Sequence, residues 1–198
     1  RLYCVLRLKD QDRIESFYQK YCAKALQMPQ LDYINWFRSA APYINAFRGK
    51  TFVIVLSGEI VRSELFSHLV HDMALCHHLG IRLVLVHGAR LQIDEILHQQ
   101  QITSSFHNNT RISEHAHMPS IVQAIETVRN TILSQLSMGL PNTPMSGSEI
   151  SVISGNFVTG MPLGIIDGVD MQRSGKVRSV DTASIRNLLG EHIVLLSN

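Results

Sequence analysis

The sequence of 198 residues has little that would tie it to an oxidising compartment, a membrane or nucleic acid. Cys4, Cys22 and Cys76 are odd in number and form no C-x-x-C pair, which predicts free thiols in a reducing cytosol and a cytoplasmic protein. No apolar run approaches the roughly 20 residues that a membrane span requires, so no membrane partner is expected. The 18 basic and 16 acidic residues leave a net charge of +2 without a Lys/Arg block, which argues against nucleic acid as a partner.

Short motifs of several catalytic and cofactor-binding classes are also missing. The chain contains no G-x-G-x-x-G, G-x-x-x-x-G-K-[ST], H-E-x-x-H or G-x-S-x-G. A dinucleotide site, a Walker-type nucleotide site, a zincin and a serine hydrolase are therefore not predicted. The ten histidines include close pairs such as His68 and His71, but no cysteine lies near enough to complete a four-ligand set. We expect no metal site and no cofactor in this chain.

Two segments have the pattern of a strand buried on both faces, followed by a glycine-containing turn and a helix. Residues 51–56 and 83–86 are apolar and rich in β-branched side chains. The first run ends at Ser57-Gly58 and the second at His87-Gly88. A βαβ unit places both turns at the carboxyl edge of one parallel sheet, where ligands of open α/β folds bind. Free backbone N–H groups there favour an anion.

Further helices and strands are predicted around this α/β unit. A helical lead-in over residues 1–28 and a helix over 31–48, with Asp32 as its cap and a kink near Pro42, precede it. A helix over 65–79 joins the two strands, and the polar stretch 99–119 is expected to be loop or short strand before a helix opens at Pro119. Short extended runs over 150–180 indicate an antiparallel meander inserted into the α/β frame. A helix over 181–189, capped by Asp181, leads to a buried strand over 193–196.

Two arginines are candidates for holding a small acidic ligand. Arg90 lies in the turn after the second strand, and Arg111 ends the polar stretch that is expected to fold over this turn. An arginine fork binds a carboxylate through two hydrogen bonds and stays charged. The alternative is a surface arginine paired with Glu59 or Glu114. Four carboxylates could act as general acids or bases, but their sequence context is more typical of ordinary turns, so a structural role is favoured. They are Asp167, Asp170, Asp181 and Glu149.

Several motifs, in the same order, closely resemble those of the N-acetylglutamate synthase family and cover about residues 31–198. They are Phe37-Arg38-Ser39-Ala40-Ala41-Pro42-Tyr43-Ile44, Arg48-Gly49-Lys50-Thr51-Phe52-Val53-Ile54, Gly80-Ile81-Arg82-Leu83-Val84-Leu85-Val86-His87-Gly88-Ala89-Arg90, Leu136-Ser137-Met138, Asn142-Thr143-Pro144-Met145, Ser154-Gly155-Asn156-Phe157, Asp167-Gly168-Val169-Asp170 and Ser174-Gly175. The resemblance implies an amino-acid-kinase-like (carbamate-kinase-like) three-layer α/β/α sandwich, with a mainly parallel sheet and an antiparallel hairpin insertion.

By the same resemblance the chain is only the N-terminal half of such a domain. It would consist of an N-terminal helical extension (1–30), a kinked helix for contact between subunits (31–48) and an incomplete kinase-like domain (49–198). An acetyltransferase domain of the GNAT type would follow and move acetyl from acetyl-CoA, its co-substrate, to the amino group of L-glutamate in the first step of arginine biosynthesis. The chain begins with Arg1 and stops just after a strand, so we expect a fragment that is inactive by itself and has a regulatory and assembly role.

The resemblance also implies ligand-binding residues, although no catalytic residue within this chain. Arg111 matches the arginine of acetylglutamate kinase that holds the substrate carboxylate, here that of L-glutamate or an N-acetylglutamate-like ligand. Tyr43 matches a tyrosine beside the site for L-arginine, the feedback effector. The helix over 31–48 would join dimers into a hexamer. The expected ligand-binding set is completed by Gly58, Gly88, Ala89, Arg90 and Asn156.

Kinase chemistry is disfavoured by two positions. The lysine that acetylglutamate kinase carries in its first strand reads Val55 here, and its run of three glycines reads Gly88-Ala89-Arg90. Leu91 stands where synthases usually have proline. Three alternatives stay open: an acetylglutamate kinase that phosphorylates N-acetylglutamate with ATP, a non-catalytic module that binds arginine or a carboxylate, and a gene remnant.

Overall fold

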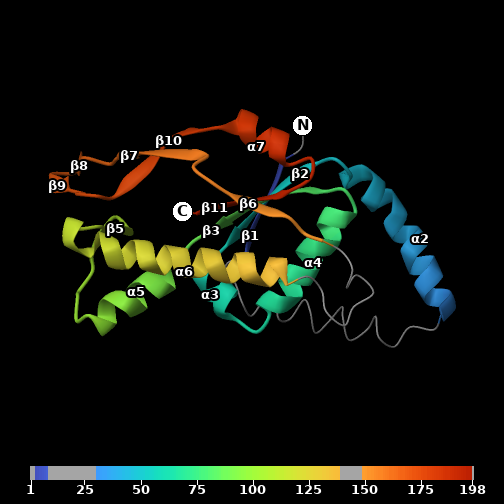
Figure 1. Cartoon of the computed structure of the whole chain (residues 1–198), viewed down its shortest axis with the longest axis horizontal. Helices are drawn as coiled ribbons and strands as arrows, with labels where there is room; N and C mark the ends of the chain where they lie inside the picture. Colours follow the sequence, from blue (N-terminus) through green and yellow to red (C-terminus); the bar gives the residue numbers. More distant parts are fainter. Residues whose placement is uncertain (1–2, 9–29, 139–148, 198) are drawn as a thin grey trace.

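The computed structural model describes residues 3–8, 30–138 and 149–197, and its centre is a parallel β-sheet (Figure 1). Within these residues the sheet has five strands in the order β1-β2-β3-β11-β6, and every neighbouring pair is parallel. The strands are β1 (Tyr3–Leu8), β2 (Thr51–Leu56), β3 (Arg82–His87), β6 (Val152–Ser154) and β11 (Ile193–Ser197). The two apolar runs of the predicted βαβ unit are the adjacent strands β2 and β3.

Helices cover both faces of the sheet. One face carries α3 (Gly58–Arg62), α4 (Phe66–His78) and α6 (Met118–Ser137), with α5 (Arg90–Gln99) beside α6. The other face carries α7 (Thr182–Leu188), whose N-cap is Asp181 as predicted. Leu83 and Leu85 of β3 point into the larger core, whereas Val84 packs with α7. This alternation buries both faces of β3 and confirms the predicted three-layer α/β/α arrangement.

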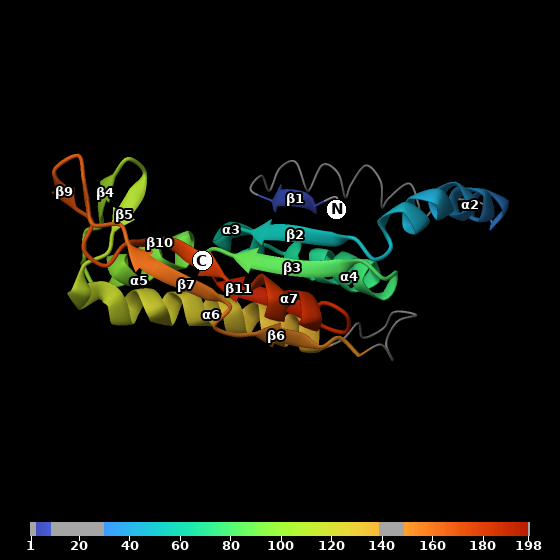
Figure 2. The same ribbon diagram turned by 90° about the horizontal axis from the view of Figure 1, so that it is seen from above.

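In the described part of the chain, three antiparallel pairs lie outside the central sheet. They are β4 (Ser105–His107) with β5 (Thr110–Ile112), β7 (Val158–Pro162) with β10 (Gly175–Val180), and β8 (Ile165–Ile166) with β9 (Val169–Asp170). A short 3₁₀ helix, η1 (His115–His117), leads into α6. The predicted antiparallel insertion is thus confirmed. β4, β5 and β9 lie at the same end of the molecule in Figures 1 and 2.

Some expectations about the elements were wrong, and one short helix was not expected. Tyr3–Leu8 is a strand rather than part of a helix, because pairing with β2 satisfies the backbone of this apolar stretch; the helical periodicity over residues 14–22 lies outside the described residues. The run at 150–153 does not belong to the meander, because its residues Val152 and Ile153 pair in parallel with β11. The short helix α3, capped by the Ser57 hydroxyl, was missed.

The helix α2 (Gln30–Phe47) projects away from the sheet (Figures 1 and 2). It begins two residues before Asp32, which lies in its first turn and is not its cap, and Pro42 lies inside it. Phe47 packs edge-on against Phe52 of β2 at 5.5 Å between ring centroids, but Ile34, Phe37 and Tyr43 are 47–67% exposed. Among the described residues, the ring contact that joins α2 to the sheet is therefore the one at its carboxyl end. Over the described residues, no helix has the length and apolar character needed to cross a membrane.

Candidate functional site

The turns after β2 and β3 lie side by side at the carboxyl edge of the sheet. Leu56 pairs with His87 in the strand register, and the Gly88 N–H donates to the Leu56 carbonyl at 2.9 Å. Parallel strands bring their carboxyl ends to one edge, which is where ligands of open α/β sheets bind. The predicted juxtaposition of Gly58 with Gly88 and Ala89 is therefore present.

The two glycines of this edge differ in access. The Gln92 side-chain amide donates to the Gly58 carbonyl at 2.8 Å, and a Cβ at residue 58 would lie 2.2 Å from Gln92 Oε1. A Cβ at Gly88 would meet no atom within 4 Å. Ala89 is the N-cap of α5 and gives no side-chain cap, so the first N–H groups of this helix are available to an anion. The open approach is at Gly88 and not at Gly58.

Arg90 and Arg111 meet at one aromatic ring. Arg90 is the first residue of α5, and its guanidinium carbon lies 5.1 Å from the centroid of Phe106. Arg111 of β5 faces Phe106 of β4 across the hairpin, with its guanidinium carbon 4.8 Å from the same centroid. Both distances are in the range of cation–π attraction. The β4–β5 hairpin thus does fold toward the turn after β3, and it brings the two candidate arginines together.

The charge around Phe106 is not balanced. Arg111 pairs with Asp94 of α5 and donates to the Ser104 hydroxyl, so its partner is neither Glu59 nor Glu114. Among the residues that the structure describes, Arg90 makes no ion pair. Two guanidinium groups and one carboxylate leave an excess positive charge at this edge. An anionic ligand, such as a carboxylate, fits it chemically.

His87 is fully buried at the end of β3, below this surface. Its Nε2 atom lies 2.8 Å from the Ser197 hydroxyl on β11, and its Nδ1 atom has no hydrogen-bond partner among the described residues. Burial, with a smaller contribution from the positive charge of Arg129, lowers the pKa of His87 to about 4. The ring is therefore neutral near pH 7 and adds no charge to the site.

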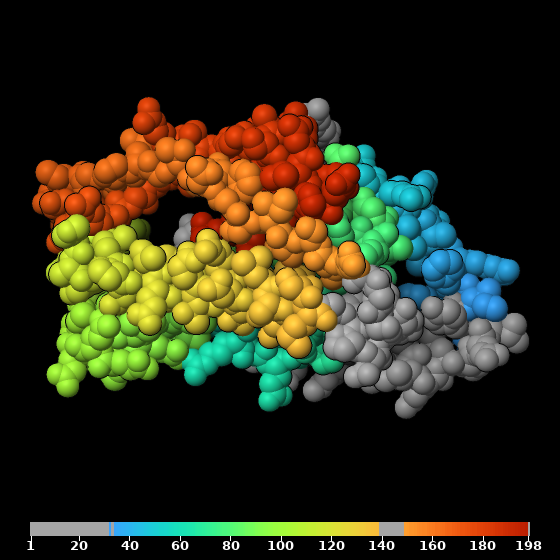
Figure 3. All heavy atoms as spheres, viewed as in Figure 1, coloured from blue at the N-terminus to red at the C-terminus, as the bar shows by residue number. Residues whose placement is uncertain are grey.

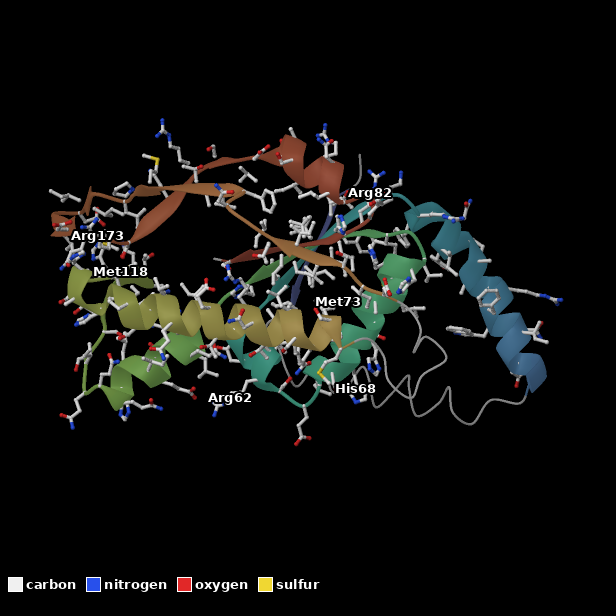
Figure 4. The ribbon with its side chains drawn as sticks, in the orientation of Figure 1. Arg62, His68, Met73, Arg82, Met118 and Arg173 are labelled. Carbon is white, nitrogen blue, oxygen red and sulfur yellow. The ribbon has the colours of Figure 1, made fainter. Side chains whose placement is uncertain are left out.

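The far end of the hairpin contacts the β8–β9 turn. His107 Nε2 and Asn108 Nδ2 each lie 3.1 Å from Asp167 Oδ2. Beyond this contact is an open cleft lined by His115, Gly160, Met161, Pro162, Asp170, Gln172, Arg173 and Gly175. Figure 3 shows the molecule hollowed between β7 and α6, and Figure 4 places Arg173 near the start of α6.

The remaining predicted site residues lie elsewhere. Asn156 is exposed just after β6, two strands away from β3 on the same carboxyl edge. Tyr43 is on α2, which leads into the amino end of β2, so it is at the opposite edge from Arg111. In the described parts of the chain, no three His, Cys, Asp or Glu side chains are grouped so that they could hold a metal ion.

Sequence reasoning missed Phe106, Asp94 and Gln92. A signal for Phe106 was present, because Asn108 and Asn109 both have positive φ and form the two-residue turn that asparagine favours. Such a turn fixes the register and sets Phe106 opposite Arg111. Asp94 and Gln92 follow Arg90 on α5, but only the packing of α5 against α3 and the hairpin gives them their partners.

Comparison with known proteins agrees with this architecture. Residues 50–198 match the amino acid kinase family. An amino-acid acetyltransferase of Pseudomonas syringae pv. syringae is 47% identical over 167 residues, which are 84% of this chain and 39% of the relative. The N-acetylglutamate synthase of Neisseria gonorrhoeae complexed with coenzyme A and L-arginine has a TM-score of 0.76 and 33% identity, over 83% of this chain and 39% of its own. The structure of the same synthase complexed with coenzyme A and N-acetyl-glutamate has a TM-score of 0.73 and 34% identity, over 83% of this chain and 37% of the synthase chain.

The chain thus spans about two fifths of the length of the relatives that it matches. The family match extends from β2 to β11 and includes the glycine turns, the arginine pair and the antiparallel insertion. The chain belongs to the amino acid kinase family.

Proposed function

We propose that the chain is the kinase-like regulatory and assembly part of a cytoplasmic amino-acid N-acetyltransferase that transfers acetyl from acetyl-CoA to L-glutamate. Acetyl transfer would reside in sequence outside this chain, so the chain alone is expected to be inactive. The observation that carries the proposal is the pair Arg90 and Arg111 on the Phe106 ring, next to the open backbone at Gly88. The identity with amino-acid acetyltransferases supports it.

In this proposal the kinase-like site binds a carboxylate without phosphoryl transfer. Arg111 is held by Asp94 and Ser104 and keeps donors for a carboxylate of an N-acetylglutamate-like ligand. Arg90 supplies a second positive charge, and Ala89 leaves the first turn of α5 without a side-chain cap, so the N–H groups of this turn can face an anion. Val55 gives β2 no cation that could contact transferring phosphates, so ATP has no electrostatic partner on this strand.

The assembly part of the proposal rests on α2. Its exposed Ile34 and Phe37 lie three residues apart on one stripe, and Tyr43 is 67% exposed. Apolar side chains exposed in such a row indicate a contact surface. We propose that α2 packs on a second copy in a hexamer and that Tyr43 lies beside a site for L-arginine as effector.

The test is calorimetric titration of the full-length protein with N-acetyl-L-glutamate, for the wild type, Arg111→Ala and Arg82→Ala. Arg82 is exposed at the amino end of β3 (Figure 4), so its replacement removes the same charge far from the site. We expect Arg111→Ala to remove one binding event per chain and Arg82→Ala to remove none. An unchanged titration for Arg111→Ala would contradict the carboxylate site.

Two activity assays complete the test on the same protein. Release of free CoA thiol with L-glutamate as acceptor is expected, and Tyr43→Ala should weaken the effect of L-arginine on this rate. ADP release from ATP with N-acetyl-L-glutamate is expected to be absent. ADP release without CoA release would favour the acetylglutamate kinase instead.

A further inference from the structure

Ser174, in the connection between β9 and β10, has a buried hydroxyl that joins two distant parts of the chain. Its side chain is 7% exposed. The hydroxyl donates to the Arg111 carbonyl at 2.5 Å and accepts from the Ser113 N–H at 2.9 Å. The hydroxyl thereby connects Ser174 to two residues that lie 61 and 63 positions earlier in the sequence. These two residues flank Ile112, the last residue of β5.

Backbone hydrogen bonds surround this contact. The Arg173 N–H donates to the Ser113 carbonyl at 3.0 Å, and Gln172 forms an isolated parallel bridge with Ser113. Ser174 itself is fixed on its own side, since its N–H donates to the Met171 carbonyl and its carbonyl accepts from Leu163 N–H, both at 2.9 Å. The β9–β10 connection is therefore a rigid support for the end of β5, and Figure 2 shows β9 beside β4 and β5.

This support acts on Arg111, the residue that faces the ligand in the function proposed above. The Arg111 backbone carbonyl is held by Ser174, while its guanidinium lies against Phe106 and pairs with Asp94. A displacement of the backbone moves the guanidinium away from both partners. Alanine at position 174 would also leave the Ser113 N–H and one lone pair of the Arg111 carbonyl without their side-chain partner, which destabilises these partly buried groups.

We propose that Ser174 is a positioning residue that fixes Arg111 for carboxylate binding and couples the ligand site to the β9–β10 connection. The proposal rests on the function proposed above for Arg111. It assigns to Ser174 no contact with the ligand. Because coupling is reciprocal, a ligand bound at Arg111 should in turn stabilise the segment around Ser174.

The test uses the full-length protein and N-acetyl-L-glutamate as the probe, and it measures the dissociation constant of the binding event that Arg111→Ala removes. We expect Ser174→Ala to weaken this binding about tenfold, which corresponds to about 1.4 kcal/mol. Ser174→Thr keeps the hydroxyl and should stay within about threefold of the wild type. Ser113→Ala keeps the backbone N–H that Ser174 binds and should have no effect.

A purely structural role is separated from positioning by a core variant. Ile132 is a residue of α6 whose side chain is buried in the larger core. Ile132→Ala is expected to lower the melting temperature without changing the dissociation constant. Ser174→Ala should change both. If Ser174→Ala lowers only the melting temperature, the positioning role is overturned, whereas an unchanged titration for Arg111→Ala overturns the carboxylate site itself.

Hydrogen exchange on the wild-type protein tests the coupling without any variant. Addition of N-acetyl-L-glutamate should slow exchange in a peptide that covers 111–115 and also in one that covers 171–175. The second peptide contains Ser174 and has no predicted ligand contact. Slower exchange in 111–115 alone would overturn the coupling.

Discussion

The His87 ring and the Ser197 hydroxyl are 2.8 Å apart and connect the carboxyl ends of β3 and β11 in the middle of the sheet. His87 and Ser197 are also partners in the parallel strand register. The hydrogen bond uses Nε2 of the imidazole, while Nδ1 is buried and finds no hydrogen-bond partner in the part of the chain that the structure describes. The neutral ring suits this position, and a proton added to it would be poorly solvated.

The first prediction is a loss of stability in acid that depends on His87. Its pKa is about 4 in the folded chain against 6.5 for the ordinary imidazole. Between these values the unfolded chain binds more protons, so the free energy of unfolding decreases as the pH falls from about 6.5 to about 4. A pKa difference of this size is worth about 3 kcal/mol. Urea unfolding at pH 7, 6, 5 and 4 measures this decrease in the free energy of unfolding.

The control for this prediction is His87→Gln, which cannot take up a proton. The free energy of unfolding of His87→Gln should be lower than that of the wild type at pH 7. Between pH 6.5 and pH 4 it should fall by about 3 kcal/mol less than that of the wild type. Carboxylates elsewhere contribute equally to both proteins. Equal pH dependence in the two proteins would show that His87 does not carry the effect.

The second prediction contrasts the two glycines of the carboxyl edge. Gly58→Ala should destabilise the fold by about 1 kcal/mol, because the new Cβ displaces the Gln92 side chain and breaks its hydrogen bond to the Gly58 carbonyl. Gly88→Ala has space for its Cβ and a φ outside the left-handed region, so its stability should equal that of the wild type. It should nevertheless weaken N-acetyl-L-glutamate binding, because a methyl group enters the open approach. Thermal unfolding and calorimetry separate these two outcomes.

A double variant checks the cause assigned to Gly58. In a Gln92→Ala background the obstructing side chain is gone, so Gly58→Ala should cost less than in the wild type. If Gly58→Ala lowers the free energy of unfolding equally in both backgrounds, Gln92 is not the residue that excludes a side chain at position 58.

The strands β2 and β3, and the position of their glycine turns at one edge of the sheet, followed from local patterns in the sequence. The runs of β2 and β3 are apolar throughout because both faces are covered, and the glycine after each marks where the chain turns into a helix. The antiparallel ribbons followed from short extended runs between turns. These features depend on residues close together in the sequence, where periodicity and turn chemistry are informative.

What was missed depends on pairing between distant segments. Nothing in Val152-Ile153 distinguishes a parallel edge strand from a meander strand, since the difference is made by β11, some forty residues later. Likewise the pairing of Arg111 with Asp94, and the bond of Ser174 to the Arg111 carbonyl, require the hairpins to be placed on α5 and β10. The residue type of Arg111 suggested that it could hold an anion, but its partners Asp94, Ser104 and Phe106 could not be predicted from the sequence.

The third prediction concerns the larger core. Ile132 of α6 is fully buried between this helix and the sheet, so Ile132→Ala should destabilise the fold by about 2–5 kcal/mol through lost burial and the cavity left behind. Val122 lies on the same helix but is 49% exposed, and Val122→Ala should cost about 0.5 kcal/mol or less. Urea unfolding of both variants measures the difference. Similar costs would mean that α6 does not pack on the sheet through the face that carries Ile132.

The fourth prediction addresses the exposed stripe of α2. Phe37 is 53% exposed and Ile34 is 47% exposed, and burying a side chain of this size in a contact between copies is worth about 1.5–3 kcal/mol. A carboxylate in this contact would lose that gain and be desolvated, so Phe37→Asp should reduce the number of chains in the full-length assembly, as measured by light scattering after size-exclusion chromatography. Asn35→Asp adds the same charge beside the stripe and should leave the mass unchanged. Phe37 is largely exposed in the single chain, so Phe37→Asp should change the melting temperature of its own domain little. A large drop in melting temperature without a change in mass would contradict the contact between copies and would place Phe37 in the core of its own domain.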